Sequence, residues 1–100
     1  MLDIIKSSKV MVFSKTTCPY CDQAKEILKS ADVQFEVQEL DTTPEGPKMQ
    51  DALQEITGQR TVPNIFIAGT HVGGCSDLQA KIKNGAVFEL FEKNDIHYKL

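Results

Sequence analysis

The sequence predicts an α/β fold in which a four-stranded mixed sheet is flanked by helices on both faces. The apolar block Val10–Phe13 is unbroken, as in a strand that is buried on both faces. Strand-like and helix-like spacings then alternate in the order strand, helix, strand, helix, hairpin, helix. A chain of 100 residues, 41% of them apolar, can bury one core but not two, so we expect residues 1–100 to form a single domain.

The first strand is predicted over residues 9–14, after a short amphipathic helix that contains Leu2, Ile5 and Lys6. The next helix is predicted to begin at Cys18-Pro19 and to end near residue 31, because proline is tolerated in a first turn, where its missing N–H has no partner. One face of this helix is apolar at the spacing i, i+3, i+4, i+7, with Ala24, Ile27, Leu28 and Ala31.

Residues 35–40 alternate with period two, which predicts a half-buried outer strand. Proline, glycine and threonine then mark a loop over residues 41–47. A second helix is predicted to end at Gly58, which is suited to a left-handed C-terminal cap. Its apolar stripe consists of Met49, Ala52, Leu53 and Ile56.

Residues 63–68 are predicted to form the third strand, and a tight Gly69-Thr70 turn leads into a short fourth strand at His71-Val72. From about residue 76 onward the spacing is that of a single final helix. Because crossover connections are right-handed, the first two strands should be parallel, and the tight turn makes the last two antiparallel.

Composition argues against several classes of partner. Eleven Lys and Arg against 14 Asp and Glu give a net charge of −3 without a basic stripe, so we expect no nucleic-acid binding. The longest apolar run, Val10–Phe13, is far shorter than the roughly 20 residues of a membrane span. Residues 1–4 carry an acid where a secretory leader is basic. We therefore expect a cytoplasmic monomer.

Two of the three cysteines form the motif Cys18-Pro19-Tyr20-Cys21, whereas Cys75 stands alone. In a reducing compartment such a pair is typically catalytic or metal-binding. Cys18 lies at a predicted helix N-terminus, where free N–H groups and the nearby Lys15 favour its thiolate form. Cys21 follows one turn later, within reach of Cys18, and is expected to keep an ordinary pKa. Cys18 is thus the candidate nucleophile, and Cys21 the candidate resolving thiol.

The Cys18–Cys21 motif resembles the active site of the dithiol glutaredoxins, a family with the thioredoxin-like fold. Two further blocks are similar to that family, Gly58–Asn64 (GQRTVPN) and Gly73–Leu78 (GGCSDL). Thioredoxins fit less well, because a tryptophan usually precedes their first cysteine and this chain has Thr17 there. The resemblance spans about residues 8–92. It implies a glutathione-dependent thiol–disulfide oxidoreductase that acts on glutathionylated or disulfide-containing proteins, with glutathione as co-substrate and no tightly bound cofactor.

The resemblance also implies which residues bind glutathione. The Val62–Pro63 bond would be cis, and the Val62 backbone would pair with the cysteinyl part of glutathione like an added strand. Lys15 and Gln50 would bind the glycine carboxylate. The N-terminus of the last helix would bind the γ-glutamyl carboxylate, with Asp77 near the α-ammonium. The remaining residues that the resemblance places in this site are Tyr20, Thr61, Gly74, Cys75 and Ser76.

Other interpretations of the cysteines stay open at this point. Cys18 and Cys21 could form half of a zinc site completed by His71 and Cys75, although a long helix after the motif is unlike a metal-binding knuckle. A [2Fe-2S] cluster could bridge two copies of the chain through Cys18 and glutathione. Cys75 is either a small residue at a helix entry, or a thiol that forms a regulatory or intermolecular disulfide or is itself glutathionylated.

Overall fold

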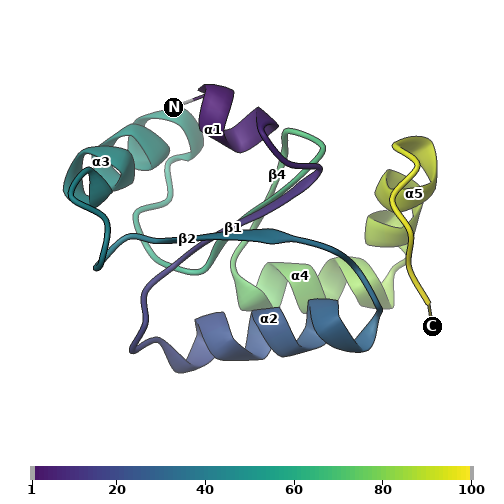
Figure 1. Cartoon of the computed structure of the whole chain (residues 1–100). Helices are drawn as coiled ribbons and strands as arrows, with labels where there is room; N and C mark the ends of the chain where they lie inside the picture. Colours follow the sequence, from purple (N-terminus) through teal and green to yellow (C-terminus); the bar gives the residue numbers. More distant parts are fainter. Residues whose placement is uncertain (1, 100) are drawn as a thin grey trace.

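A four-stranded sheet with the strand order β2-β1-β3-β4 lies at the centre of the computed structural model, which describes residues 2–99 (Figure 1). The strands are β1 (Val10–Ser14), β2 (Glu36–Glu39), β3 (Asn64–Ile67) and β4 (Thr70–Gly73). The helices are α1 (Leu2–Lys6), α2 (Pro19–Ser30), α3 (Gly46–Thr57), α4 (Cys75–Lys83) and α5 (Ala86–Lys93). Within residues 2–99 no helix is long and apolar enough to cross a membrane.

The strand directions agree with those predicted from the sequence. Strands β1 and β2 are parallel, whereas β3 is antiparallel to both β1 and β4. The register sets Ser14 opposite Glu39 on one side of β1, and Phe13 opposite Asn64 on the other. The end of β1 therefore lies beside the start of β3. The loop that leads into α2 and the loop that precedes β3 therefore meet at this end of the two central strands.

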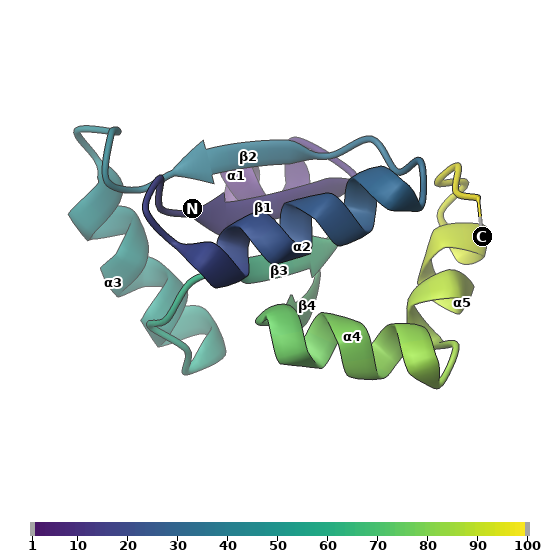
Figure 2. The same cartoon turned by 90° about the horizontal axis from the view of Figure 1, so that it is seen from below.

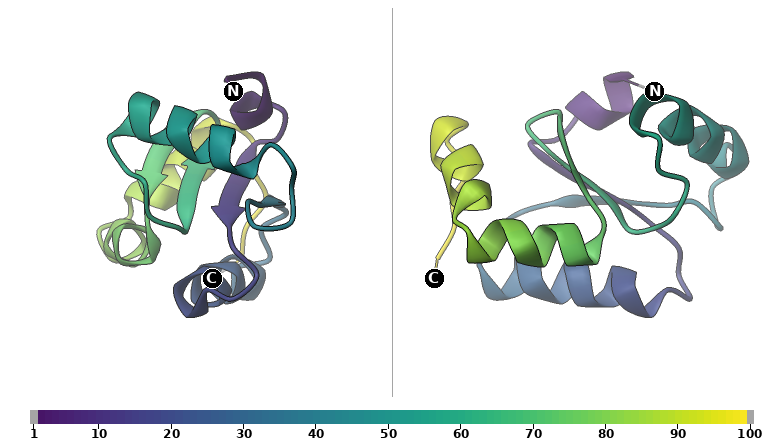
Figure 3. Two further views of the ribbon diagram at one scale, coloured as in Figure 1. Left: turned by 90° about the vertical axis from the view of Figure 1, so that its left-hand side faces the viewer. Right: turned by 180° about the vertical axis from the view of Figure 1, so that it is seen from behind.

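Helices cover both faces of the sheet, as predicted. Helices α2 and α4 lie across one face, and α1 and α3 lie on the opposite side (Figures 2 and 3). Val10 and Val12 of β1 belong to the core under α2 and α4, whereas Met11 and Phe13 belong to the core under α1 and α3. The first core also contains Ala24, Leu28, Leu78 and Phe91, and the second Ile5, Met49, Leu53 and Phe66.

The prediction of a single final helix from about residue 76 is wrong, because the structure has two helices there. Helix α4 ends at Lys83, and α5 begins at Ala86 after a break at Gly85. Gly85 has φ 83°, a left-handed conformation that glycine adopts without steric cost. Helix α5 consequently turns away from α4 across the end of the molecule (Figure 1). The apolar spacing continues through the break, which explains why it did not reveal the change of direction.

Candidate active site

Cys18 lies directly before α2 and acts as its N-terminal cap. Its backbone is extended, with φ −106° and ψ 109°, and its sulfur accepts a hydrogen bond of 3.1 Å from the N–H of Cys21. The same sulfur lies 3.7 Å from the carbonyl oxygen of Val62. The thiol is partly exposed. A sulfur that accepts an N–H at the positive end of a helix dipole is stabilised as a thiolate.

Cys21 has the opposite environment, since it is fully buried one turn into α2. Burial, together with the hydrogen bond to Cys18, raises the pKa of the Cys21 thiol to about 11, although contacts with the Lys15 backbone and the Ser14 side chain lower it in part. The expectation of an ordinary pKa for Cys21 is therefore wrong. At neutral pH Cys21 is thus a protonated, buried thiol next to the partly exposed Cys18.

The Val62–Pro63 peptide bond is cis, as the resemblance implied. It forms one wall of a cavity of about 480 Å³, and although Cys18 does not line this cavity, its sulfur lies 3.7 Å from the carbonyl oxygen of the lining residue Val62. Every predicted glutathione-binding residue except Lys15 and Gln50 lines this cavity. The lining consists of Tyr20, Gln59, Thr61, Val62, Pro63, Gly74, Cys75, Ser76 and Asp77. The structure thus collects residues from three separate parts of the sequence around one hollow.

Lys15 and Gln50 lie outside the lining of this cavity. The side-chain amide of Gln50 donates a hydrogen bond of 2.9 Å to the carbonyl of Arg60, which ties α3 to the loop before Pro63. The half-buried Lys15 belongs to a loop that Asp41 anchors, because the carboxylate of Asp41 accepts hydrogen bonds from the backbone N–H and the hydroxyl of Thr16. The Thr16 hydroxyl and the nearby Lys15 charge lower the pKa of Asp41, so the anchor stays ionised.

Sequence reasoning missed Gln59, which lines the cavity and whose amide contacts the loop before β3. Gln59 belongs to the block Gly58–Asn64 on which the resemblance rests, and this was the only feature of the sequence that pointed to a role for it. Its polar side chain directly after the glycine cap of α3 resembles any exposed loop residue in a sequence. Nothing in residue type or spacing indicated where the amide would point.

The N-terminus of α4 is already partly occupied by the chain itself. The carboxylate of Asp77 accepts a hydrogen bond of 2.9 Å from the N–H of Gly74. Gly73 has φ 115°, and a side chain there would collide with the Asp77 carboxylate. Cys75, the first residue of α4, is buried, and burial together with the charge of Cys18 raises its pKa. Its thiol faces the side chain of Gln23 at 3.8 Å.

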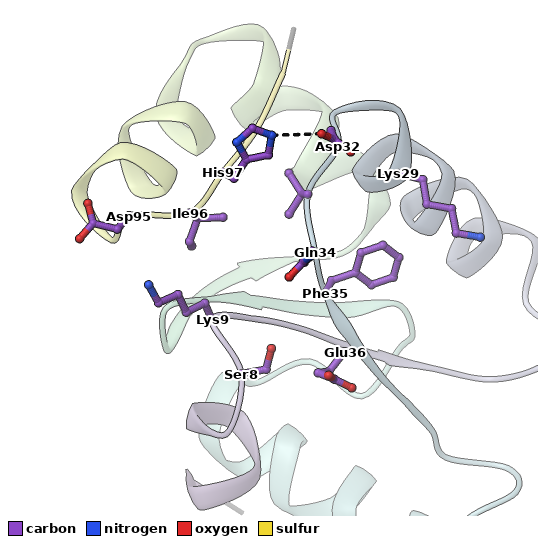
Figure 4. A pocket seen from close by; sticks show the side chains of 11 residues that line it. Ser8, Lys9, Lys29, Asp32, Gln34, Phe35, Glu36, Asp95, Ile96 and His97 are labelled. Atoms are coloured by element: carbon purple, nitrogen blue, oxygen red, sulfur yellow. Dashed lines mark hydrogen bonds and ion pairs between the residues drawn. The ribbon is translucent and has the colours of Figure 1, made fainter.

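A larger cavity of about 880 Å³ lies at the other end of β1 (Figure 4). Its walls mix both signs of charge, and His97 is hydrogen-bonded to Asp32 at 3.0 Å across one side. No cysteine lines it. The residues around it are Ser8, Lys9, Lys29, Asp32, Val33, Gln34, Phe35, Glu36, Asp95, Ile96 and His97. The smaller cavity is the one close to the Cys18–Cys21 pair, because its lining residue Val62 has its carbonyl oxygen 3.7 Å from the Cys18 sulfur.

The zinc alternative lacks its set of ligands. In the part of the chain that the structure describes, no three side chains of His, Cys, Asp or Glu gather as a metal ion requires. A ring nitrogen of His71 instead lies 2.8 Å from the side-chain oxygen of Asn64.

Comparison with known proteins agrees with this arrangement. The glutaredoxin family model matches residues 10–72, which include both cysteines of the pair and Val62–Pro63. A glutaredoxin of Ricinus communis is 48% identical over 88 residues, 88% of this chain and 86% of that protein. Glutaredoxin-C2 of Arabidopsis thaliana is also 48% identical, over 88% of this chain and 79% of its own length. The buckwheat glutaredoxin–glutathione complex has a TM-score of 0.89 and 37% identity, covering 92% of this chain and 84% of that one.

Proposed function

Because the chain belongs to the glutaredoxin family of thiol–disulfide oxidoreductases, we propose that it uses glutathione to reduce glutathionylated proteins and protein disulfides. The observation that carries this proposal is the Cys18 sulfur, which is partly exposed, accepts the Cys21 N–H and faces the Val62 carbonyl beside the cavity. The complex of buckwheat glutaredoxin with glutathione, a chain 37% identical to this one, supports the choice of co-substrate.

The first step is nucleophilic attack by the Cys18 thiolate on the glutathione sulfur of a glutathionylated substrate. A new sulfur–sulfur bond forms to Cys18, the old one breaks, and the substrate leaves as a thiolate that takes a proton from water. The helix N-terminus and the N–H of Cys21 stabilise Cys18 as a thiolate. The same stabilisation also speeds the later step in which Cys18 is released from its mixed disulfide, because a stable thiolate is a better leaving group.

The mixed disulfide on Cys18 is resolved in one of two ways, depending on the substrate. A glutathionyl adduct is attacked by a second glutathione thiolate, which releases glutathione disulfide and restores the Cys18 thiolate without Cys21. When the substrate is a protein disulfide, Cys18 breaks that bond and becomes joined to one of its sulfurs, and Cys21 then loses its proton, attacks the Cys18 sulfur and expels the reduced protein. Two molecules of glutathione then reduce the Cys18–Cys21 disulfide. The buried, protonated state of Cys21 favours the first route at neutral pH.

The cavity suggests how glutathione is held. Val62 would pair through its backbone with the cysteinyl residue, and the N-terminus of α4 at Gly74 would face the γ-glutamyl carboxylate. Tyr20 and Thr61 would form the sides of the groove. Lys15 and Gln50 flank the cavity without lining it, so their contact with the glycine carboxylate requires their side chains to turn toward the ligand.

A coupled assay tests the proposal, with glutathione, glutathione reductase and NADPH, and with either a small glutathione mixed disulfide or a protein disulfide as substrate. Cys18→Ser should abolish both activities, because no thiolate attacks. Cys21→Ser should keep turnover of the small mixed disulfide and lose most of the protein-disulfide reduction. Loss of both activities in a folded Cys21→Ser protein would contradict this division of roles. So would a wild-type protein without turnover.

Three further expectations accompany this proposal. We expect residues 1–100 to act as one monomeric domain, which size-exclusion chromatography with light scattering measures directly. Cytoplasmic location stays a prediction, checked by fractionation of cells. Visible absorption of an iron–sulfur chromophore in an inactive, dimeric protein would instead support a cluster bridging two copies through Cys18.

A further inference from the structure

The side chain of Gln59 spans the loop that carries Val62. Its amide nitrogen lies 3.0 Å from the carbonyl oxygen of Thr61 and 3.0 Å from that of Pro63. A glutamine amide has two N–H donors, so one side chain can bind both carbonyls at once. Val62 is the residue between these two carbonyls.

The backbone of Gln59 is held at the end of α3. The backbone N–H of Gln59 donates to the hydroxyl of Thr57 at 3.0 Å, and that hydroxyl donates to the carbonyl of Leu53 at 2.7 Å. Gly58, with φ 78°, donates its N–H to the carbonyl of Gln54 and ends α3. The residue that carries the donors is therefore anchored to α3 through its backbone, whereas both acceptor carbonyls belong to the loop.

The start of this loop is also held at Arg60, whose carbonyl accepts a hydrogen bond from the Gln50 amide and whose guanidinium binds Asp51 and Gln54, but these contacts stop short of Val62. Thr61 and Val62 form a bend before β3 begins at Asn64, so no sheet hydrogen bonds hold them. Pro63 has no N–H to donate. With the carbonyls of Thr61 and Pro63 turned toward Gln59, the carbonyl of Val62 faces the Cys18 sulfur. Among residues 2–99 the N–H of Val62 has no hydrogen-bond partner, which leaves it available to an incoming peptide.

We propose that Gln59 is a positioning residue, which binds the carbonyls of Thr61 and Pro63 and thereby aims the Val62 backbone at the peptide part of glutathione. The inference rests on the proposed use of glutathione and adds a residue to it. Gln59 acts through the loop, without contact to the reacting sulfur atoms. Its removal should weaken binding of the glutathionyl group and leave the intrinsic reactivity of Cys18 largely unchanged.

The test compares two substitutions with a matched control. Gln59→Met keeps the length of the side chain and removes both donors, and Gln59→Glu places a carboxylate opposite two carbonyl oxygens. Gln79→Met makes the same chemical change at an exposed position of α4. With a glutathionylated peptide as substrate, we expect KM to rise about ten-fold in Gln59→Met and further in Gln59→Glu, with kcat within about two-fold of wild type. Gln79→Met should leave both constants unchanged.

A second measurement needs no turnover. In the free protein, the carbonyl carbon NMR signals of Thr61 and Pro63 should shift in Gln59→Met and stay in place in Gln79→Met. Unchanged carbonyl signals, or a fall in kcat at constant KM, would overturn the positioning role. A wild-type protein without glutathione-dependent turnover would overturn the proposed function instead, and the carbonyl signals would still decide whether Gln59 holds the loop.

Discussion

Helices α2 and α4 lie on the same face of the sheet, and each has a cysteine at its N-terminal end, but the two thiols have opposite surroundings. Cys18 caps α2, is partly exposed and accepts an N–H at 3.1 Å. Cys75 is the first residue of α4 and is buried, and the N–H of Gly74 is bound by Asp77. We therefore expect the position at a helix N-terminus alone to be insufficient for reactivity, with Cys18 the reactive thiol of the two. The sulfur must also be accessible and must itself receive the hydrogen bond.

The largest expected contrast comes from removing each thiol in turn. Cys18→Ser should lower turnover of a small glutathione mixed disulfide by about a thousand-fold or more, because a serine hydroxyl is not ionised at neutral pH. Cys75→Ser should stay within about two-fold of wild type. The coupled assay measures both, with melting temperatures as a control for folding. A comparable loss in a stable Cys75→Ser protein would show that both helix N-termini take part.

Alkylation compares the two thiols without relying on a substrate. At pH 7 iodoacetamide should modify Cys18 about a hundred-fold faster than Cys75, since burial raises the pKa of Cys75 and shields its sulfur. Mass spectrometry of the digested protein gives both rates. In denaturant the two rates should converge. Equal rates in the folded protein would mean that burial does not protect Cys75.

The buried Cys21 thiol should make the unfolding free energy of the protein depend on pH in the alkaline range. Its folded-state pKa is raised from 9.0 to about 11, so its stabilising contribution is complete below pH 9 and disappears as the pH rises to about 11. We expect the folded protein to lose about 2 kcal/mol of unfolding free energy across this range through Cys21. Cys21→Ala should lack this part of the alkaline loss. Denaturant titrations at several pH values would show it, and identical curves for the two proteins would contradict it.

The smallest effect concerns the polar cap of α4. Asp77→Asn weakens the hydrogen bond to the Gly74 N–H and removes a negative charge from the first turn, so it should cost about 1 kcal/mol of stability. It should also change the salt dependence of glutathione binding, because this carboxylate lines the cavity. Calorimetry at low and high salt measures this effect. Glu89→Gln, which removes an exposed carboxylate from the first turn of α5 outside this cavity, is the control for the effect on binding.

The sequence predicted those features that depend on local pattern. The apolar block Val10–Phe13 identified the central strand, because a strand covered on both faces has no polar alternation. The spacing of Cys18 and Cys21 predicted that the two residues lie one turn apart at the start of α2, where the Cys21 N–H donates to the Cys18 sulfur. The break at Gly85 escaped prediction, because glycine is tolerated within a helical pattern and the apolar spacing continues beyond it.

The features that depend on side-chain direction were not predictable. The Gln59 amide reaches two carbonyls only because α3 ends at Gly58 in a left-handed turn, and its target loop bends back toward it. Burial of Cys21 beneath Cys18 likewise follows from how α2 packs on the sheet, so its raised pKa could not be inferred from spacing. Such contacts join groups whose relative positions are set by tertiary structure.

Strand β2 lies at an edge of the sheet, has only four residues and begins and ends with a glutamate, Glu36 and Glu39. Open strand edges can pair with strands of other proteins and start aggregation, and short, charged edges resist this. This matters for the proposed mechanism, in which Cys18 becomes covalently joined to its substrates. During that time a partly unfolded substrate is held at high local concentration, and an edge that repels strand addition allows the two proteins to separate once the disulfide is resolved.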